Sequence, residues 1–190
     1  MTITSSRVLT SSDLFTRIVR VFAATLVAAA AAHIAFPLPF TPVPFTLQPL
    51  AVLGVGLTLG PLEGALAMVA YLLEGACGLP VFSPTGIGGL LQLLGPTGGY
   101  LLSYPLVAAL AGLATIMKRR QASPYLSALL ACSLATALLF LAGAGWLAHF
   151  AHLGIRQAWS AGIAPFLPGE AVKVLAAAGG YRAFHRPTAN

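Results

Sequence analysis

The chain has 190 residues, of which 58% are hydrophobic and only 7% are charged, and its formal net charge at pH 7 is +6. A soluble domain of this size needs a surface rich in charged side chains, so the composition excludes a soluble globular protein and indicates an integral membrane protein. The positive charge does not indicate a nucleic-acid partner, because basic and aromatic residues are not interleaved as such binding requires.

Six apolar segments are separated by proline, glycine or charged residues, and we tested each against the roughly 20 apolar residues that a membrane-spanning helix needs. In chain order they cover residues 14–36, 47–60, 62–79, 99–117, 124–149 and 166–183. The second is short, and its Gly54, Gly56 and Gly60 indicate close packing of helices. We therefore expect an all-α integral membrane protein in which residues 1–190 form a single six-helix domain, with residues 1–12 as a flexible cytoplasmic N-terminus.

The ten Lys and Arg residues predict how these helices are oriented. With the N-terminus inside and six crossings, eight of the ten fall on the cytoplasmic side, where membrane proteins collect basic residues. These eight are Arg7, Arg17, Arg20, Lys118, Arg119, Arg120, Arg182 and Arg186. We therefore expect an N-in, C-in protein that crosses the inner, cytoplasmic cell membrane several times.

The connections on the predicted outer side are long or unusual in composition. The first, FPLPFTPVPF, contains four prolines, which exclude a helix and favour a stiff extended strap. The second has nine Gly or Pro among the twenty residues from Pro80 to Gly99. Non-helical backbone near a membrane is tolerated where protein covers it or where it lines a cavity. These loops therefore either cover a ligand pocket or serve as solvated connectors.

Ionisable residues in a spanning segment are costly and usually face the protein interior. Glu170 and Lys173 lie three residues apart on one face of the last segment, near its outer, N-terminal end. They form either a self-neutralising pair or the polar floor of a pocket, in which Lys173 attracts an anionic group and Glu170 accepts hydrogen bonds from N–H donors. Glu74, near the outer end of the third segment, either lines the same pocket or caps polar backbone.

The sequence contains no motif that assigns an enzymatic reaction. No GxxxxGK[ST], GxSxG or HExxH pattern occurs, and GVGLTLG lies inside an apolar segment without a preceding strand. We expect no catalytic residues, no metal site and no cofactor, so uphill transport would need energy from another protein or an ion gradient. Ala24, Ala28 and Ala32 form a stripe that either allows a partner helix to dock or arises by chance in an alanine-rich run.

Four blocks of the sequence resemble, in order and spacing, the BioY family, the biotin-specific substrate-binding (S) components of energy-coupling factor (ECF) transporters. The blocks are TPVPFTLQPLAVLGVGLTLGP, GALAMVAYLLEGACGLPVF, LLGPTGGYLLSYP and PFLPGEAVKVLAA, and together they extend from Thr41 to Ala177. The resemblance implies six membrane helices that bind biotin from the outside with high affinity. It also implies a transmembrane coupling protein and two cytoplasmic ATPases as partners, with the alanine stripe as the contact for the coupling protein.

The resemblance also implies roles for individual residues. Lys173 would pair with the biotin carboxylate, Glu170 would accept ureido N–H groups, and Phe45 would contact the apolar parts of the ligand. The family most often has Asp where this chain has Glu170, so the carboxylate here reaches one methylene further. Further implied contacts are Gln48, Thr85, Gly86, Gln92 and Tyr100.

Three other functions stay open at this stage. The first is an S component for a different vitamin, such as riboflavin or thiamine, which would share the six-helix plan without these blocks. The second is a small membrane enzyme that uses Glu170 and Lys173 as acid and base, although no nucleophile or metal motif accompanies them. The third is a stand-alone transporter that needs no ATPase.

Overall fold

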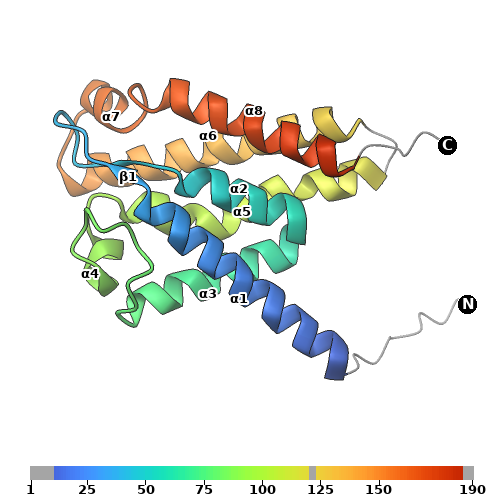
Figure 1. The fold of residues 1–190 in the computed structure, drawn as a ribbon. Helices are drawn as coiled ribbons and strands as arrows, with labels where there is room; N and C mark the ends of the chain where they lie inside the picture. The colour runs from blue at the N-terminus through green and yellow to red at the C-terminus, as the bar shows by residue number, and fades with distance from the viewer. Residues whose placement is uncertain (1–10, 120–122, 186–190) are drawn as a thin grey trace, which may run out of the picture.

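The computed structural model describes residues 11–119 and 123–185, and most of them lie in helices (Figure 1). The helices are α1 (Ser11–His33), α2 (Gln48–Leu59), α3 (Pro61–Ala76), α4 (Gly89–Leu94), α5 (Gly98–Arg119), α6 (Pro124–Phe150), α7 (Ile155–Gly162) and α8 (Leu167–Phe184). Two short strands, β1 (Ala35–Phe36) and β2 (Phe45–Thr46), pair antiparallel between α1 and α2. Of the N-terminus predicted to be flexible, residues 1–10 lie outside the described residues, whereas residues 11 and 12 begin α1.

The six predicted segments correspond to α1, α2, α3, α5, α6 and α8, and each boundary lies within three residues of its expected place. Three helices are long and apolar enough to cross a membrane by themselves, namely Asp13–His33, Gly98–Met117 and Pro124–Phe150. The bent pair α7 and α8, at 53°, passes the same test as one span. α2 has 12 residues and is only about 18 Å long. Among the described residues, the structure thus shows three to four candidate spans, fewer than the six predicted.

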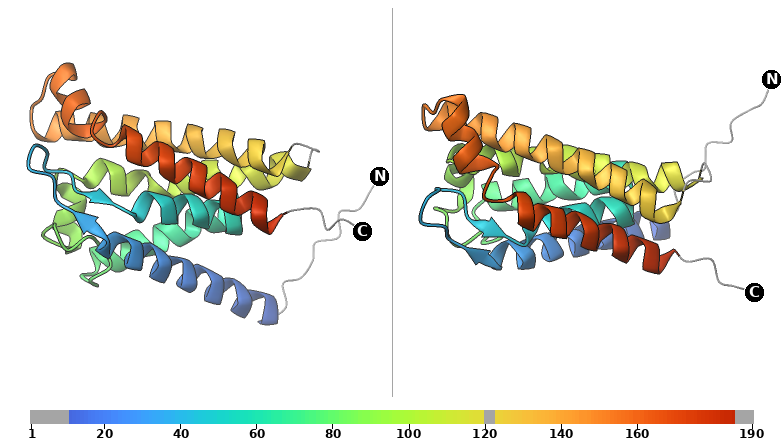
Figure 2. Two further views of the ribbon diagram at one scale, coloured as in Figure 1. Left: turned by 45° about the horizontal axis from the view of Figure 1, so that its top comes forward. Right: turned by 90° about the horizontal axis from the view of Figure 1, so that it is seen from above.

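α5 and α6 make the most extensive contact between helices, and the other long helices surround this pair (Figure 2). α2 and α3 pack on α5, α8 packs on α6 and α2, and α1 lies at the edge against α2 and α3. A glycine permits the close approach of α2 to α5, since a Cβ on Gly56 would lie 2.2 Å from the Ala108 carbonyl oxygen. Gly54 faces open space, and Gly60, with φ of +83°, ends α2. Only Gly56 of the three therefore confirms the predicted close packing.

The alanine stripe of α1 faces the interior of the bundle. Ala28 and Ala32 are 0% exposed and Ala24 is 7% exposed, whereas Phe22 and Val27 point outward. Small side chains let helix backbones approach closely, and here they do so between α1 and its neighbours α2 and α3. The stripe is an internal packing surface in this conformation. The prediction that a partner docks on it stays a prediction, and in this conformation α2 and α3 lie against α1.

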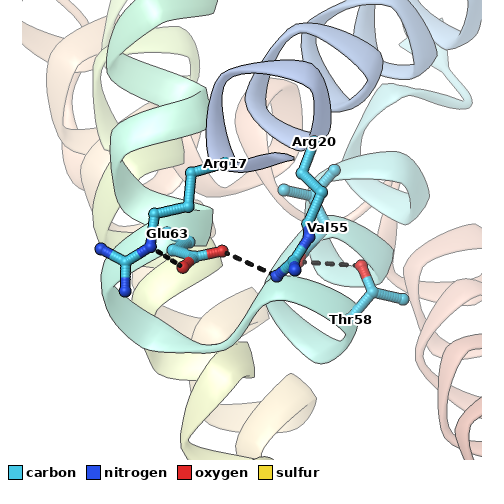
Figure 3. A network of polar contacts seen from close by, with 5 residues as sticks. All are labelled: Arg17, Arg20, Val55, Thr58 and Glu63. Carbon is cyan, nitrogen blue, oxygen red and sulfur yellow. Dashed lines mark hydrogen bonds and ion pairs between the residues drawn. The ribbon is translucent and has the colours of Figure 1, made fainter. Parts of the chain in front are cut away.

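Glu63, in the first turn of α3, ties this helix to α1 (Figure 3). Its Oε1 atom lies 3.4 Å from Arg17 Nε, and its Oε2 atom lies 3.6 Å from Arg20 Nη1. Beside them, the Thr58 hydroxyl donates to the Val55 carbonyl oxygen within α2. These contacts lie at the end of the bundle where α1 begins and α8 ends (Figure 1).

The connections predicted to lie on the outer side gather at the other end of the bundle, where Figure 1 shows β1, α4 and α7. The first was predicted to be an extended strap, but it folds back as a hairpin because β1 pairs with β2. The Thr41 hydroxyl anchors this hairpin to α7 by donating to the Ala161 carbonyl oxygen over 2.8 Å. α4 and α7, which the sequence did not predict, complete this end of the molecule.

Candidate functional site

A cavity lies at the end of the bundle where the hairpin, α4 and α7 gather. Its volume is about 570 Å³, including space open to solvent. The polar lining residues are Thr46, Gln48, Ser83, Gln92, Thr97, Tyr100, Tyr104 and Glu170, and the apolar ones are Val43, Pro44, Pro49, Leu101, Leu139, Phe140 and Phe166. Apolar walls with a few polar groups are typical of small-molecule sites, and among these lining residues only Glu170 is charged.

Glu170 and Lys173 form a buried ion pair beside the cavity. The Lys173 ammonium lies 2.5 Å from Glu170 Oε1, and both side chains are only 5% exposed. The same ammonium donates to the Thr46 carbonyl oxygen over 2.6 Å and lies 4.3 Å from the centre of the Phe45 ring. Glu170 Oε2 is enclosed and has no hydrogen-bond partner among the described residues. One carboxylate oxygen is thus held by the protein, and the other is left to accept a further donor.

The start of α8 explains how this pair is positioned. Glu170 lies in the first turn of α8, where the helix dipole favours a negative charge. Gly169 allows the hairpin to reach the helix, because a Cβ there would lie 2.3 Å from the Phe45 ring. Phe45 in turn stacks on Phe166, with ring centres 6.5 Å apart and planes 5° apart. The hairpin and α8 therefore hold the ion pair between them.

Lys173 occupies a different place from the one that the sequence suggested. It was expected to meet an anionic group of a ligand, but it does not line the cavity. Its ammonium is engaged by Glu170, by the Thr46 carbonyl oxygen and by the Phe45 ring. This geometry favours a positioning role, in which Lys173 neutralises Glu170 and fastens β2 to α8.

Gln48 lines the cavity with a fixed orientation. Its Nε2 atom donates to the Tyr71 hydroxyl over 2.7 Å, and Tyr71 donates onward to the Val81 carbonyl oxygen over 2.7 Å. The Gln48 amide oxygen has no hydrogen bond to the described residues. Gln48 therefore offers the cavity an acceptor that the protein has already oriented.

The connection between α3 and α5 supplies Gln92, which is used mainly to hold its own loop. Gln92 Oε1 accepts from Gly88 N over 3.1 Å, and Nε2 donates to the Ser83 carbonyl oxygen over 3.4 Å. Thr85 bonds to the Ser83 hydroxyl over 2.9 Å, and Gly86 lies against Gln92, since a Cβ there would be 2.5 Å from Cδ of Gln92. Thr85 and Gly86 thus contact the lining residues Ser83 and Gln92 but do not line the cavity themselves.

The remaining predicted residues also differ in their placement. Tyr100 lines the cavity, but its hydroxyl donates to the Gly162 carbonyl oxygen over 2.6 Å. Phe45 supports Lys173 from outside the cavity lining. Glu74, near the end of α3, is half-buried and is not brought to the cavity.

Sequence reasoning missed Ser83, Thr97 and Tyr104 as lining residues. Tyr104 follows Tyr100 by four residues in α5, so the two share one face of the helix. That spacing was a usable signal for Tyr104. Ser83 and Thr97 lie in loops, where no periodicity marks the residues that face inward. Over residues 11–119 and 123–185, no three His, Cys, Asp or Glu side chains come together as a possible metal site.

Comparisons with known proteins agree with this architecture. The model of the BioY family matches residues 4–190. A probable biotin transporter BioY of Pyrococcus horikoshii is 38% identical over 136 residues, which are 72% of this chain and 76% of the relative. The biotin transporter BioY of Thermotoga maritima is 38% identical over 141 residues, which are 74% of this chain and 80% of the relative.

A solved structure has the same fold. It is the crystal structure of the S-component for biotin from an ECF-type ABC transporter, and it superimposes with a TM-score of 0.83. The match covers 95% of this chain and 96% of that chain at 23% sequence identity. With the family model matched over nearly the whole sequence, the chain belongs to the BioY family.

Proposed function

We propose that this chain captures biotin with high affinity at the outer face of the cytoplasmic membrane and transports it as the substrate-binding component of an ECF-type transporter. Its relatives are biotin transporters, and the solved structure that shares its fold is an S-component for biotin. The observation that carries the proposal is the enclosed Glu170 Oε2 atom beside the cavity, which lacks a partner among the described residues. Membership of a transporter family leaves no enzymatic reaction to assign.

The chemistry of biotin complements this cavity. Its ureido ring carries two N–H donors, and an ionised carboxylate such as Glu170 accepts hydrogen bonds without donating any. Its thiophane ring and aliphatic tail suit the apolar walls formed by Leu139, Phe140 and Phe166. Gln48 supplies a further oriented acceptor.

For the orientation in the membrane, we propose a single domain of residues 1–190 with six crossing helices, α1, α2, α3, α5, α6 and α8, and with both termini inside. The start of α1, the end of α5 and the end of α8 lie at one end of the bundle (Figure 2). Arg17, Arg20, Lys118, Arg119 and Arg182 are near these points in the sequence. Membrane proteins collect Lys and Arg on the cytoplasmic side, which supports this orientation.

As partners we propose a membrane-embedded coupling protein and two cytoplasmic ATPases, besides membrane lipid. The solved structure with the same fold comes from an ECF-type ABC transporter, and this sequence has no GxxxxGK[ST] motif of its own. The stripe of Ala24, Ala28 and Ala32 would reach the coupling protein only if α1 moved away from α2 and α3, because the stripe is buried. A partner can contact the outward face of α1 without such a movement.

Equilibrium binding to the purified full-length protein tests the proposed function. We expect saturable biotin binding that biotin analogues displace and that lipoate, riboflavin and thiamine do not. A folded protein that binds none of these ligands, or that prefers riboflavin or thiamine, would contradict the assignment. Melting curves with and without ligand establish that the protein is folded in each case.

A further inference from the structure

The polar groups that line the cavity divide into those already bonded within the protein and those without a partner there. Gln92 uses both ends of its amide on its own loop, and the Tyr100 hydroxyl is donated to Gly162. The Tyr104 hydroxyl makes no hydrogen bond with residues 11–119 or 123–185, and neither does Glu170 Oε2. Tyr104 and Glu170, like Gln48 with its amide oxygen, are therefore buried lining residues that each leave a polar group without a partner among the described residues.

Tyr104 lies deep in the structure for a residue with an unbonded hydroxyl. It is 3% exposed and belongs to the cavity wall contributed by α5. A buried tyrosine hydroxyl usually finds a partner, because leaving it unbonded away from water is unfavourable. In the described residues, the fully enclosed side-chain atoms without a partner are Thr136 Oγ1 and Glu170 Oε2, and the Tyr104 hydroxyl is not one of them. It is therefore reached from the open space of the cavity.

Tyr104 and Glu170 approach the cavity from different helices. Tyr104 belongs to α5 and Glu170 to α8, and both helices pack on α2 and α6. Both side chains line the same cavity. An ionised carboxylate can only accept hydrogen bonds, whereas a phenol can donate one. Together they match a group that carries an N–H and a carbonyl oxygen side by side.

We propose that Tyr104 is a ligand-recognition residue, which donates a hydrogen bond to the ureido carbonyl oxygen of biotin while Glu170 accepts a ureido N–H. This assignment rests on the proposed function, since it takes biotin as the ligand. Tyr104 supplies a hydrogen-bond donor for the carbonyl oxygen, which Glu170 cannot do because an ionised carboxylate repels that oxygen. Tyr104 thereby selects a cyclic urea over a ring that presents a poor acceptor in the same place.

The test compares Tyr104→Phe with the wild-type protein for two ligands, biotin and its thio analogue, in which sulfur replaces the ureido oxygen. Sulfur is a weak hydrogen-bond acceptor. We expect Tyr104→Phe to weaken biotin binding by about fivefold to tenfold, the loss of one hydrogen bond, and to weaken thio-analogue binding by less than about twofold. The preference for biotin over the thio analogue should therefore shrink in the variant.

The melting temperature without ligand separates recognition from folding. The Tyr104 hydroxyl has no hydrogen bond to the described residues, so its removal should leave the ligand-free melting temperature unchanged. Tyr181→Phe is the matched control, because Tyr181 is a buried tyrosine that does not line the cavity. We expect this control to keep the wild-type preference between the two ligands.

Two results would overturn the assignment while leaving the proposed function intact. The first is an unchanged affinity of Tyr104→Phe for biotin, which would mean that another donor, such as the Thr97 hydroxyl, binds the carbonyl oxygen. The second is an equal loss for both ligands, which would indicate a change in the shape of the cavity. If the wild-type protein itself binds no biotin, the proposed function fails first, and the assignment of Tyr104 fails with it.

Discussion

Glu63 and Glu170 each pair with basic side chains, but they lie at opposite ends of the bundle and in opposite surroundings. The Glu63 side chain is 22% exposed, and its partners Arg17 and Arg20 are about half exposed, at distances of 3.4 and 3.6 Å. Glu170 and Lys173 are both 5% exposed and lie 2.5 Å apart. The first group is a surface contact, and the second is sealed inside the protein.

The effect of an ion pair on stability differs between the two ends of the bundle. An exposed ion pair contributes about 0–1 kcal/mol to stability, because water and salt screen it. A buried pair gains little over an apolar core, but removing one partner costs about 3–5 kcal/mol, because an uncompensated charge is left behind. A buried pair is thus poorly explained by stability alone. At Glu170 the free carboxylate oxygen next to the cavity supplies the functional explanation.

The largest effect is expected from Lys173→Met, which removes the positive partner and leaves Glu170 buried alone. We expect the free energy of unfolding to fall by about 3–5 kcal/mol and biotin affinity to fall by about a hundredfold or more. Because Lys173 contacts Glu170 and Thr46 and does not line the cavity, biotin and its methyl ester should lose affinity by similar factors. Binding isotherms for both ligands check this.

Lys173→Arg is the matched control, since it keeps the positive charge and should retain part of the affinity for both ligands. A loss confined to biotin, with the ester unaffected, would mean that Lys173 meets the ligand carboxylate. In that case Lys173 would be a ligand contact and not a positioning residue.

Glu170→Gln is expected to have a smaller effect. The amide keeps an acceptor oxygen for Lys173 but loses the negative charge, and a hydrogen bond to a charged group is worth about 1.5–3 kcal/mol. We therefore expect biotin affinity to fall by about tenfold to a hundredfold. Titration of the purified variant measures this.

Glu170→Asp is the control that separates the effect of the charge from that of side-chain length, because it keeps the carboxylate on a side chain that is one methylene shorter. It should retain more affinity than Glu170→Gln. Wild-type affinity in Glu170→Gln would show that Glu170 is structural, and the two glutamates would then differ only in burial.

The helices were predictable because apolar runs bounded by proline or glycine determine where helices can lie. α4 and α7 were missed because six and eight residues are too few for a periodic pattern to stand out from a loop. The spacing of the alanine stripe of α1 indicates that a helix can pack closely on it, but not which helix does so. In this structure those neighbours are α2 and α3.

The site was predictable in part for a similar reason. Glu170 and Lys173 stand out because charge is rare in an apolar segment. The role of Lys173 depends on the Thr46 carbonyl oxygen, which is 127 residues away in the sequence, so no local pattern could reveal it. Gln92 and Tyr100, which were expected to contact the ligand, line the cavity, but their hydrogen bonds to Ser83 and Gly162 exist only in the folded chain.

The smallest effect is expected from Glu63→Gln at the other end of the bundle. Both ion pairs are lost, but they are exposed, so the free energy of unfolding should fall by no more than about 1 kcal/mol, and less in high salt. Biotin affinity should stay at its wild-type value, because Glu63 does not line the cavity. Arg17→Gln should have a smaller effect still, because Arg20 keeps its own contact with Glu63. Melting curves at low and high salt, together with biotin titrations, measure both quantities. A fall in biotin affinity of tenfold or more would show that the contact between α1 and α3 influences the site, and the two ends could no longer be treated as independent.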